Sequence, residues 1–124
     1  MLDAMNTAEE RRLQAYQAKL QQLTAELAST GFISSGSVVR RYTRCGKPGC
    51  RCQADPPQPH GPYWQWTTLV DGKTVTRRLN ERQARLYQEW IANRRRLRKT
   101  LAEIERLSQR AADLLLKDAE LRDS

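Results

Sequence analysis

The chain has 124 residues, with 22 Lys and Arg against 14 Asp and Glu, and a formal net charge of +8. Hydrophobic residues make up 39% and aromatic residues 6%, which fits one domain and excludes a large globular core. Residues 38–99 carry fifteen Lys and Arg against four acidic residues, a net of +11. The positive charge therefore belongs to the middle of the chain, where a polyanionic partner would dock.

The sequence indicates an intracellular setting. Residues 1–12, MLDAMNTAEERR, lack the basic and apolar regions of an export signal. No run approaches the roughly 18 apolar residues of a membrane span. An odd number of cysteines argues against a disulfide framework. We therefore expect a cytoplasmic protein without membrane association, and a nucleoid-associated one if it binds DNA.

Residues 7–29 predict an amphipathic helix. Thr7 and Glu10 have the spacing of a capping box, and Gly31 can adopt the left-handed conformation that ends a helix. The apolar side chains recur every three or four residues and form a narrow a/d stripe: Leu13, Tyr16, Leu20, Leu23 and Leu27.

Residues 32–79 have the composition of a small β-module. Residues 38–42 are short and β-prone. Residues 63–70 and 73–79 flank Asp71-Gly72, which is a strong signal for a hairpin.

Residues 80–124 predict one long helix. Asn80 is a suitable N-cap with Gln83 three residues later, and neither Gly nor Pro follows Gly72. Its apolar stripe holds a rough heptad phase: Leu86, Trp90, Asn93, Leu97, Leu101, Ile104, Ser108, Ala111 and Leu115.

Together these elements predict an α+β fold. A small β-hairpin module, which we expect to be stapled by a metal ion at the cysteines and histidine described next, lies between a short N-terminal helix and a long C-terminal helix, and the two helices pair antiparallel as a coiled coil. The three segments, 1–31, 32–79 and 80–124, form one structural domain. Because the C-terminal helix is longer than the N-terminal helix, part of its apolar stripe stays uncovered, which predicts a homodimer or a docked partner protein.

All three cysteines and the only histidine lie within sixteen residues, as Cys45-x4-Cys50-x-Cys52-x7-His60. Three thiolates and one imidazole suit tetrahedral zinc. The Cys-x-Cys gap is tighter than the commonest zinc pattern, and three small buried cysteines with a surface histidine are the alternative interpretation. We favour a structural zinc ion, whose binding would fold a Gly/Pro-rich loop with little apolar mass. A shell of four protein ligands leaves no open position for catalysis, so we expect no enzyme.

The basic residues of the middle segment form the candidate nucleic-acid surface. Arginine dominates, and its planar fork binds two acceptors at once, which favours phosphate and base-edge contacts. A merely solvated charged face is the alternative. The candidate contact residues are Arg40, Arg41, Arg44, Lys47, Arg51, Lys73, Arg77, Arg78, Arg82, Arg85, Arg94, Arg95 and Arg96.

The aromatic side chains have two interpretations. Tyr42, Tyr63, Trp64 and Trp66 could stack on unpaired bases. So small a module has few other residues to bury, which favours a core role for Trp64, Trp66 and Trp90.

The run CGKPGCRC at residues 45–52, followed by HGPYW at 60–64, an Asp-Gly hairpin and a basic helix, resembles a family of small uncharacterised prokaryotic proteins. They are catalogued as a domain of unknown function, and some are associated with mobile elements. The resemblance covers about residues 38–100 and leaves the flanking helices outside. It implies a metal or folding role for the Cys/His set and a DNA-related setting, but supplies no activity. The residues that carry it are Cys45, Gly46, Lys47, Cys50, Cys52, His60, Gly61, Pro62 and Tyr63.

These observations predict a non-enzymatic accessory protein that binds nucleic acid, DNA rather than RNA, through a zinc-stabilised module and the start of the long helix. The alternative is a protein–protein interaction adaptor that acts through the helical pair and has no direct contact with nucleic acid.

Overall fold

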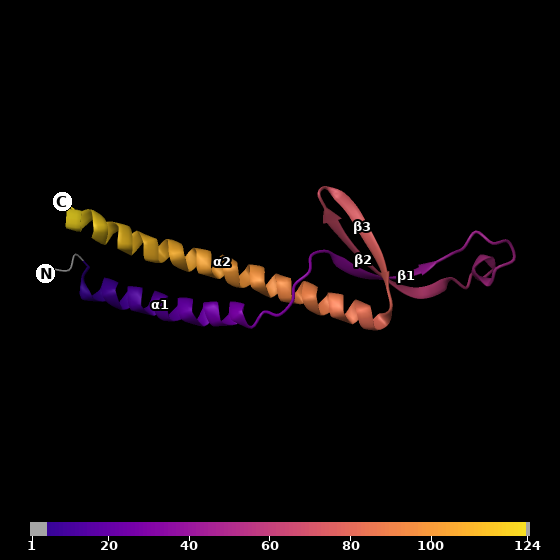
Figure 1. Ribbon diagram of the computed structural model, residues 1–124, viewed down its shortest axis with the longest axis horizontal. Helices are drawn as coiled ribbons and strands as arrows, with labels where there is room; N and C mark the ends of the chain where they lie inside the picture. The colour runs from indigo at the N-terminus through magenta and orange to yellow at the C-terminus, as the bar shows by residue number, and fades with distance from the viewer. Residues whose placement is uncertain (1–4, 124) are drawn as a thin grey trace. The chain divides into compact units, whose positions relative to one another are not determined.

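The computed structural model describes residues 5–123 and has an α+β architecture, as expected. Along the chain, one helix precedes and one follows a three-stranded antiparallel sheet (Figure 1). The elements in chain order are α1 (Thr7–Ala28), β1 (Ser37–Thr43), the short 3-10 helix η1 (Arg51–Gln53), β2 (His60–Val70), β3 (Lys73–Leu79) and α2 (Glu81–Asp123).

The chain divides into two compact units. Among the described residues, the helical unit contains residues 5–31 and 95–123, and the sheet unit contains Phe32–Arg94. The helix α2 is continuous and contributes its first part to the sheet unit and the remainder to the helical unit. No helix among the described residues combines the length and the apolarity that a bilayer crossing requires.

The capping box of α1 lies one residue earlier than the sequence predicts. Asn6 is the N-cap, and its side chain accepts from the backbone N–H of Glu9 at 2.8 Å, while Glu9 accepts from the backbone N–H of Asn6 at 3.4 Å. The predicted pair, Thr7 and Glu10, was therefore wrong. Asn is as strong an N-cap as Ser or Asp, and it precedes an acidic residue with the same three-residue spacing.

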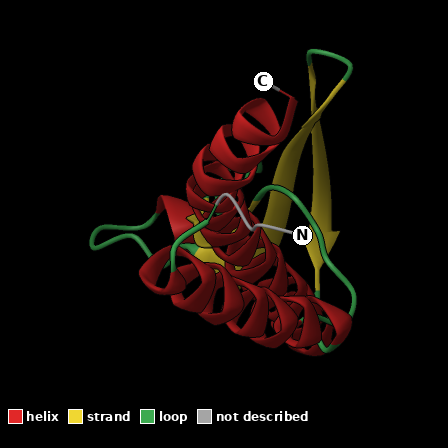
Figure 2. Ribbon diagram, turned by 90° about the vertical axis from the view of Figure 1, so that its left-hand side faces the viewer, coloured by secondary structure: helices red, strands yellow, loops and turns green. Residues whose placement is uncertain are grey.

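In the helical unit, α1 and the C-terminal part of α2 lie side by side and run in opposite directions (Figures 1 and 2). Near the start of α1, the buried Glu9 pairs with Lys117 at 3.5 Å, whereas Leu23, near the end of α1, lies beside Glu103 and Leu107. Leu23 is only 1% exposed and is the centre of this packing. The apolar stripe of α1 therefore faces α2, as predicted.

The stripe of α2 has a different phase from the predicted one. Leu97, Ile104 and Ala111 lie on the covered face, as expected. Leu101 and Leu115, however, are both 48% exposed. The other covered positions of this stripe are Thr100, Leu107 and Leu114. The helix offers apolar side chains in either phase, so only the position of α1 selects between them.

The sheet has the order β1-β2-β3, and every neighbouring pair is antiparallel. The strands β2 and β3 form the predicted hairpin, in which Asp71 and Gly72 both take positive φ angles, 51° and 77°. Positive φ at both central residues gives the right-handed twist that a two-residue hairpin loop requires. The strand predicted at residues 38–42 corresponds to β1.

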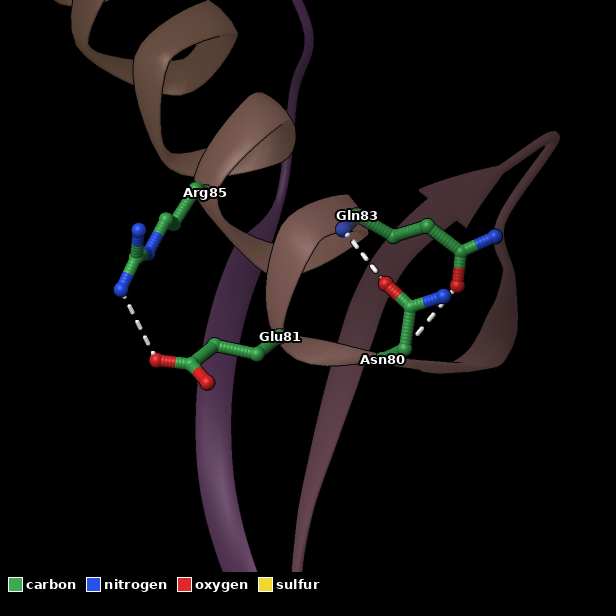
Figure 3. A network of polar contacts seen from close by, with 4 residues as sticks. All are labelled: Asn80, Glu81, Gln83 and Arg85. Carbon is green, nitrogen blue, oxygen red and sulfur yellow. Dashed lines mark hydrogen bonds and ion pairs between the residues drawn. The ribbon is translucent and has the colours of Figure 1, made fainter.

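One face of the sheet packs against the first part of α2, whose N-terminus is capped as predicted. Asn80 and Gln83 exchange hydrogen bonds of 2.8 and 2.9 Å with each other's backbone N–H (Figure 3). Leu79 and Ala84 are buried at this junction.

The segment before β1 completes this core. The side chain of Asn93, which is only 6% exposed, donates to the carbonyl of Phe32 at 2.8 Å. The ring of Phe32 meets that of Trp90 edge-on, with centroids 6.4 Å apart. Trp66 donates from Nε1 to the carbonyl of Ser35 at 2.9 Å. The aromatic residues Trp66 and Trp90 therefore belong to the packing of the unit, which agrees with the core interpretation.

Candidate functional site

The three cysteines lie in the long loop between β1 and β2, and the histidine opens β2. Thr43 and His60 are paired at the end of the sheet, after an irregularity in the register that follows Arg41. Both ends of the loop are thus held by strand pairing. A β-bulge of this kind re-aims neighbouring side chains next to a site.

Within the loop, two tight turns bring the thiols together. The first closes with a hydrogen bond of 3.3 Å from the backbone N–H of Cys50 to the carbonyl of Lys47, and Gly49 has a φ of 80° there. A side chain at that φ would be strained, which explains the glycine. The second turn is η1, which contains Cys52. The Gln58 N–H then donates to the carbonyl of Arg51 at 3.1 Å and returns the proline-rich segment toward the cysteines.

The donor atoms of Cys45, Cys50, Cys52 and His60 all lie within 4.8 Å of one another. Sγ of Cys45 is 3.5 Å from Sγ of Cys52, and Sγ of Cys50 is 3.1 Å from Nε2 of His60. The cysteines are free thiols. Neighbouring ligands of a tetrahedral zinc ion with ordinary bond lengths are about 3.6–3.8 Å apart. The cluster therefore has the ligand types and the compactness that a metal ion requires.

The protein environment separates the acidities of the thiols. A backbone hydrogen bond from Cys52, with further hydrogen bonds from the side chains of Cys45, Cys52 and His60, lowers the pKa of Cys50 to about 6. Cys52 is fully buried, and burial raises its pKa. The backbone N–H of Cys45, which donates to Sγ of Cys52 at 3.2 Å, acts in the opposite direction. One thiolate is thus available to an incoming cation near neutral pH.

The structure does not bring the thirteen candidate basic residues into one cluster. Eleven of them lie in the sheet unit, whereas Arg95 and Arg96 begin the α2 portion of the helical unit. Three lie beside the cysteines in the loop: Arg44, Lys47 and Arg51. Five lie on the strands: Arg40, Arg41, Lys73, Arg77 and Arg78. Three lie on the first part of α2: Arg82, Arg85 and Arg94.

The strand arginines alternate between the two faces of the sheet. On one face, Arg40 donates to the hydroxyl of Tyr42 at 3.1 Å, and Arg77 donates to the hydroxyl of Tyr87 at 3.4 Å. On the other face, Arg41 and Arg78 contact Gln65 and Tyr63.

Gln65 was not a candidate in the sequence, and Tyr63 was considered as a base-stacking residue and as part of the family motif, but not as a partner of an arginine. The signal that could have identified their role is the two-residue period of a strand, which places both on the same face.

The fold and the cluster define a small α+β protein with a Cys₃His set that could hold a metal ion. The chain belongs to the family described as a domain of unknown function, DUF6788, whose sequence model matches residues 8–88. The match includes α1, which the resemblance noted in the sequence had left outside. Neither a curated protein nor a solved structure matches the chain.

Proposed function

We propose that the protein is a zinc-stabilised, non-enzymatic accessory protein that binds DNA. The observation that carries the proposal is the Cys₃His cluster, because its four donors lie within 4.8 Å in the unit that holds most of the positive charge. Residues 32–94 carry eleven Lys and Arg against four acidic residues, a net of +7 out of +8 for the chain. A metal-held scaffold that presents excess positive charge suits a polyanion.

Zinc is the proposed metal. Three sulfur donors and one imidazole match its borderline-soft preference, and calcium and magnesium prefer oxygen donors. The loop of residues 44–59 has one fully buried residue, Cys52, so its fold has little hydrophobic support. The binding free energy of the ion would supply that support. A shell filled by four protein ligands provides structure rather than a site for substrate.

The test of the metal is elemental mass spectrometry on the purified full chain, with the Cys52→Ala variant measured alongside. About one zinc ion per chain, lost in the variant, is the expected result. Protein that is purified without chelator and carries no metal would overturn the zinc proposal.

The test of DNA binding is fluorescence anisotropy with a labelled duplex over a range of salt. If the protein contacts six or more phosphates, its affinity falls by about a thousandfold or more between roughly 50 and 200 mM salt. An affinity that hardly changes with salt, or the absence of binding at low salt, would contradict a nucleic-acid function.

The helical unit supports a second candidate, a protein–protein interaction adaptor. Pairing of α1 and α2 as a coiled coil would bury one stripe, yet four leucines in the helical-unit part of α2 stay exposed: Leu101, Leu115, Leu116 and Leu121, at 48%, 48%, 68% and 50%. Such side chains suit a homodimer or a docked helix. Light scattering after size-exclusion chromatography separates a dimer from a monomer, and this candidate predicts no binding in the anisotropy measurement.

The cellular setting follows from the same proposal. A DNA-binding protein of this kind would act in the cytoplasm at the nucleoid, and an association with mobile elements would be consistent with a DNA-related role. Fractionation of cells that carry a tagged full chain would test this: co-sedimentation with the nucleoid, lost after nuclease treatment, is the expected result.

A further inference from the structure

The three-stranded sheet has one covered face and one exposed face. Trp66 and Leu79 lie on the covered face, against the first part of α2. The register places the alternate residues on the other side. In β1 and β2, Arg41 is opposite Tyr63, and in β2 and β3, Gln65 is opposite Arg78. Directly paired residues of antiparallel strands share a face, so these four side chains form a cross-strand group on the exposed face.

This group holds two arginines in defined orientations. Nη1 of Arg41 donates to Oε1 of Gln65 at 3.1 Å. The guanidinium of Arg78 lies 3.6 Å from the centre of the Tyr63 ring. The Arg41–Gln65 hydrogen bond uses one of five guanidinium donors, and the stack on Tyr63 uses the face of the Arg78 guanidinium rather than its edge. Both arginines therefore keep donors for a ligand, and much of the entropy of ordering them is already lost.

The charge on this face has one sign. Among the strand residues, all of which the structure describes, there are no acidic side chains. Asp71 lies in the turn between β2 and β3, and the acidic residue nearest to Arg78 along the chain is Glu81, which shares the lining of an open hollow with Tyr63 and Arg78. Its carboxylate is bound by Arg85 at 2.9 Å (Figure 3). An anionic ligand on the exposed face would therefore meet little repulsion.

Two observations favour a duplex over a single strand. Proteins that hold single strands stack bases on open aromatic faces. Tyr63 is the aromatic residue of this group, and Arg78 covers its ring. Trp66 is on the opposite face, stacked on Tyr87. The spacing of the strands is also compatible with a duplex: the axes of the two outer strands are roughly 10 Å apart, and the major groove of B-DNA is about 12 Å wide.

We propose that this exposed sheet face enters the major groove of duplex DNA, with Arg41 and Arg78 as the contact residues and Gln65 and Tyr63 as the residues that position them. Strands are an established means of reading the groove, and an arginine fork matches the O6 and N7 acceptors of guanine. The inference rests on the proposed DNA-binding function and selects one surface for it.

The strands supply a matched control for the test. Arg40 and Arg77 are exposed neighbours of Arg41 and Arg78 on the same two strands, but they lie on the opposite face. The full-length double variant R41Q/R78Q and the control R40Q/R77Q lose the same charge. The probe is a labelled mixed-sequence duplex of about two helical turns, roughly 20 base pairs, with the corresponding single strand measured alongside. Thermal melting of each variant checks the fold.

The sheet variant is expected to weaken duplex binding by about a hundredfold, on the order of tenfold for each lost arginine contact, and the control by less than about threefold. If R41Q/R78Q melts at a lower temperature than the control, the variant R41K/R78K replaces it. This variant keeps the positive charge and removes the guanidinium fork, and its duplex affinity is expected to fall by about tenfold.

Four results would overturn the inference. Equal losses in the two variants, or a loss confined to R40Q/R77Q, would reject the exposed face while DNA binding itself stands. Tighter binding of the single strand by the native protein would reject the groove. A native protein that binds neither probe at low salt would reject the proposed function together with this inference.

Discussion

The rings of Trp66 and Tyr87 stack with their centroids 4.6 Å apart and their planes inclined by 25°. One residue lies in the central strand β2 and the other in α2, so this pair connects the sheet to the helix that covers it. Trp90 meets Tyr87 edge-on at 5.2 Å and extends the cluster. These three aromatic residues thus stabilise the sheet unit and are engaged with one another.

Substitution Tyr87→Ala should lower the free energy of unfolding by about 2–4 kcal/mol, since it removes both ring contacts from a half-buried site. Urea unfolding followed by tryptophan fluorescence measures this loss. The matched control is Tyr42→Ala, because Tyr42 is 55% exposed and should cost less than about 1 kcal/mol. Equal costs for the two variants would show that the cluster does not stabilise the unit.

Asn6→Ala should destabilise the protein by about 1 kcal/mol, because the backbone N–H of Glu9 loses its acceptor at the start of α1. The sequence predicted Thr7 as the capping residue, but Thr7→Ala should alter stability by less than about 0.5 kcal/mol. Thermal melting followed by circular dichroism compares the two variants. A larger effect of Thr7→Ala would indicate that Thr7, and not Asn6, is the N-cap.

Leu23→Ala should cost about 2–5 kcal/mol, since this side chain is fully buried between α1 and α2 and its removal leaves a cavity. Leu20→Ala makes the same chemical change on the same helix at a position that is 40% exposed, and should cost about 1–2 kcal/mol. Chemical denaturation of both variants gives the comparison. The packing of the helical unit would be misassigned if Leu20 proved the more sensitive.

Removal of the metal by a chelator should loosen the loop of residues 44–60 and spare the start of α2, residues 81–94. The loop depends on the cluster for its fold, whereas the helix is held by the aromatic contacts with the sheet. Hydrogen–deuterium exchange before and after chelation measures the two segments in one experiment. Unchanged exchange in the loop would mean that hydrogen bonds alone hold it.

In the metal-free protein, Cys50 should be the first thiol to react with iodoacetamide, and its rate should rise through about pH 6. Its pKa is lowered from an ordinary value of 9.0, so the folded state binds fewer protons than the unfolded state between these values. The resulting stabilisation is fully present above pH 9 and is lost as the pH falls through about 6.

Mass spectrometry of the labelled peptides follows each cysteine separately. Cys52, which is buried and has a raised pKa, should react more slowly than Cys50 at neutral pH and serves as the internal control. A labelling midpoint near pH 9 for Cys50 would contradict the hydrogen bonding of its sulfur.

The sequence by itself determined the local features of this protein. The Asp71-Gly72 turn, the Asn80 cap and the absence of helix breakers in α2 each depend on residues close together in the chain. The Cys/His cluster could also be predicted from the sequence, because its four members lie within sixteen residues of a loop rich in glycine and proline.

Only the tertiary structure decided the features that depend on a partner element. The covered stripe of α2 includes Leu107 and Leu114, whereas Leu101 and Leu115 are both 48% exposed, because the position of α1 selects among leucines on adjoining sides of the helix. In the same way, the charge of a strand arginine is visible in the sequence, but its face is set by strand register and by the helix that covers the other side. That is why Arg41 and Arg78 form one group while Arg40 and Arg77 lie opposite.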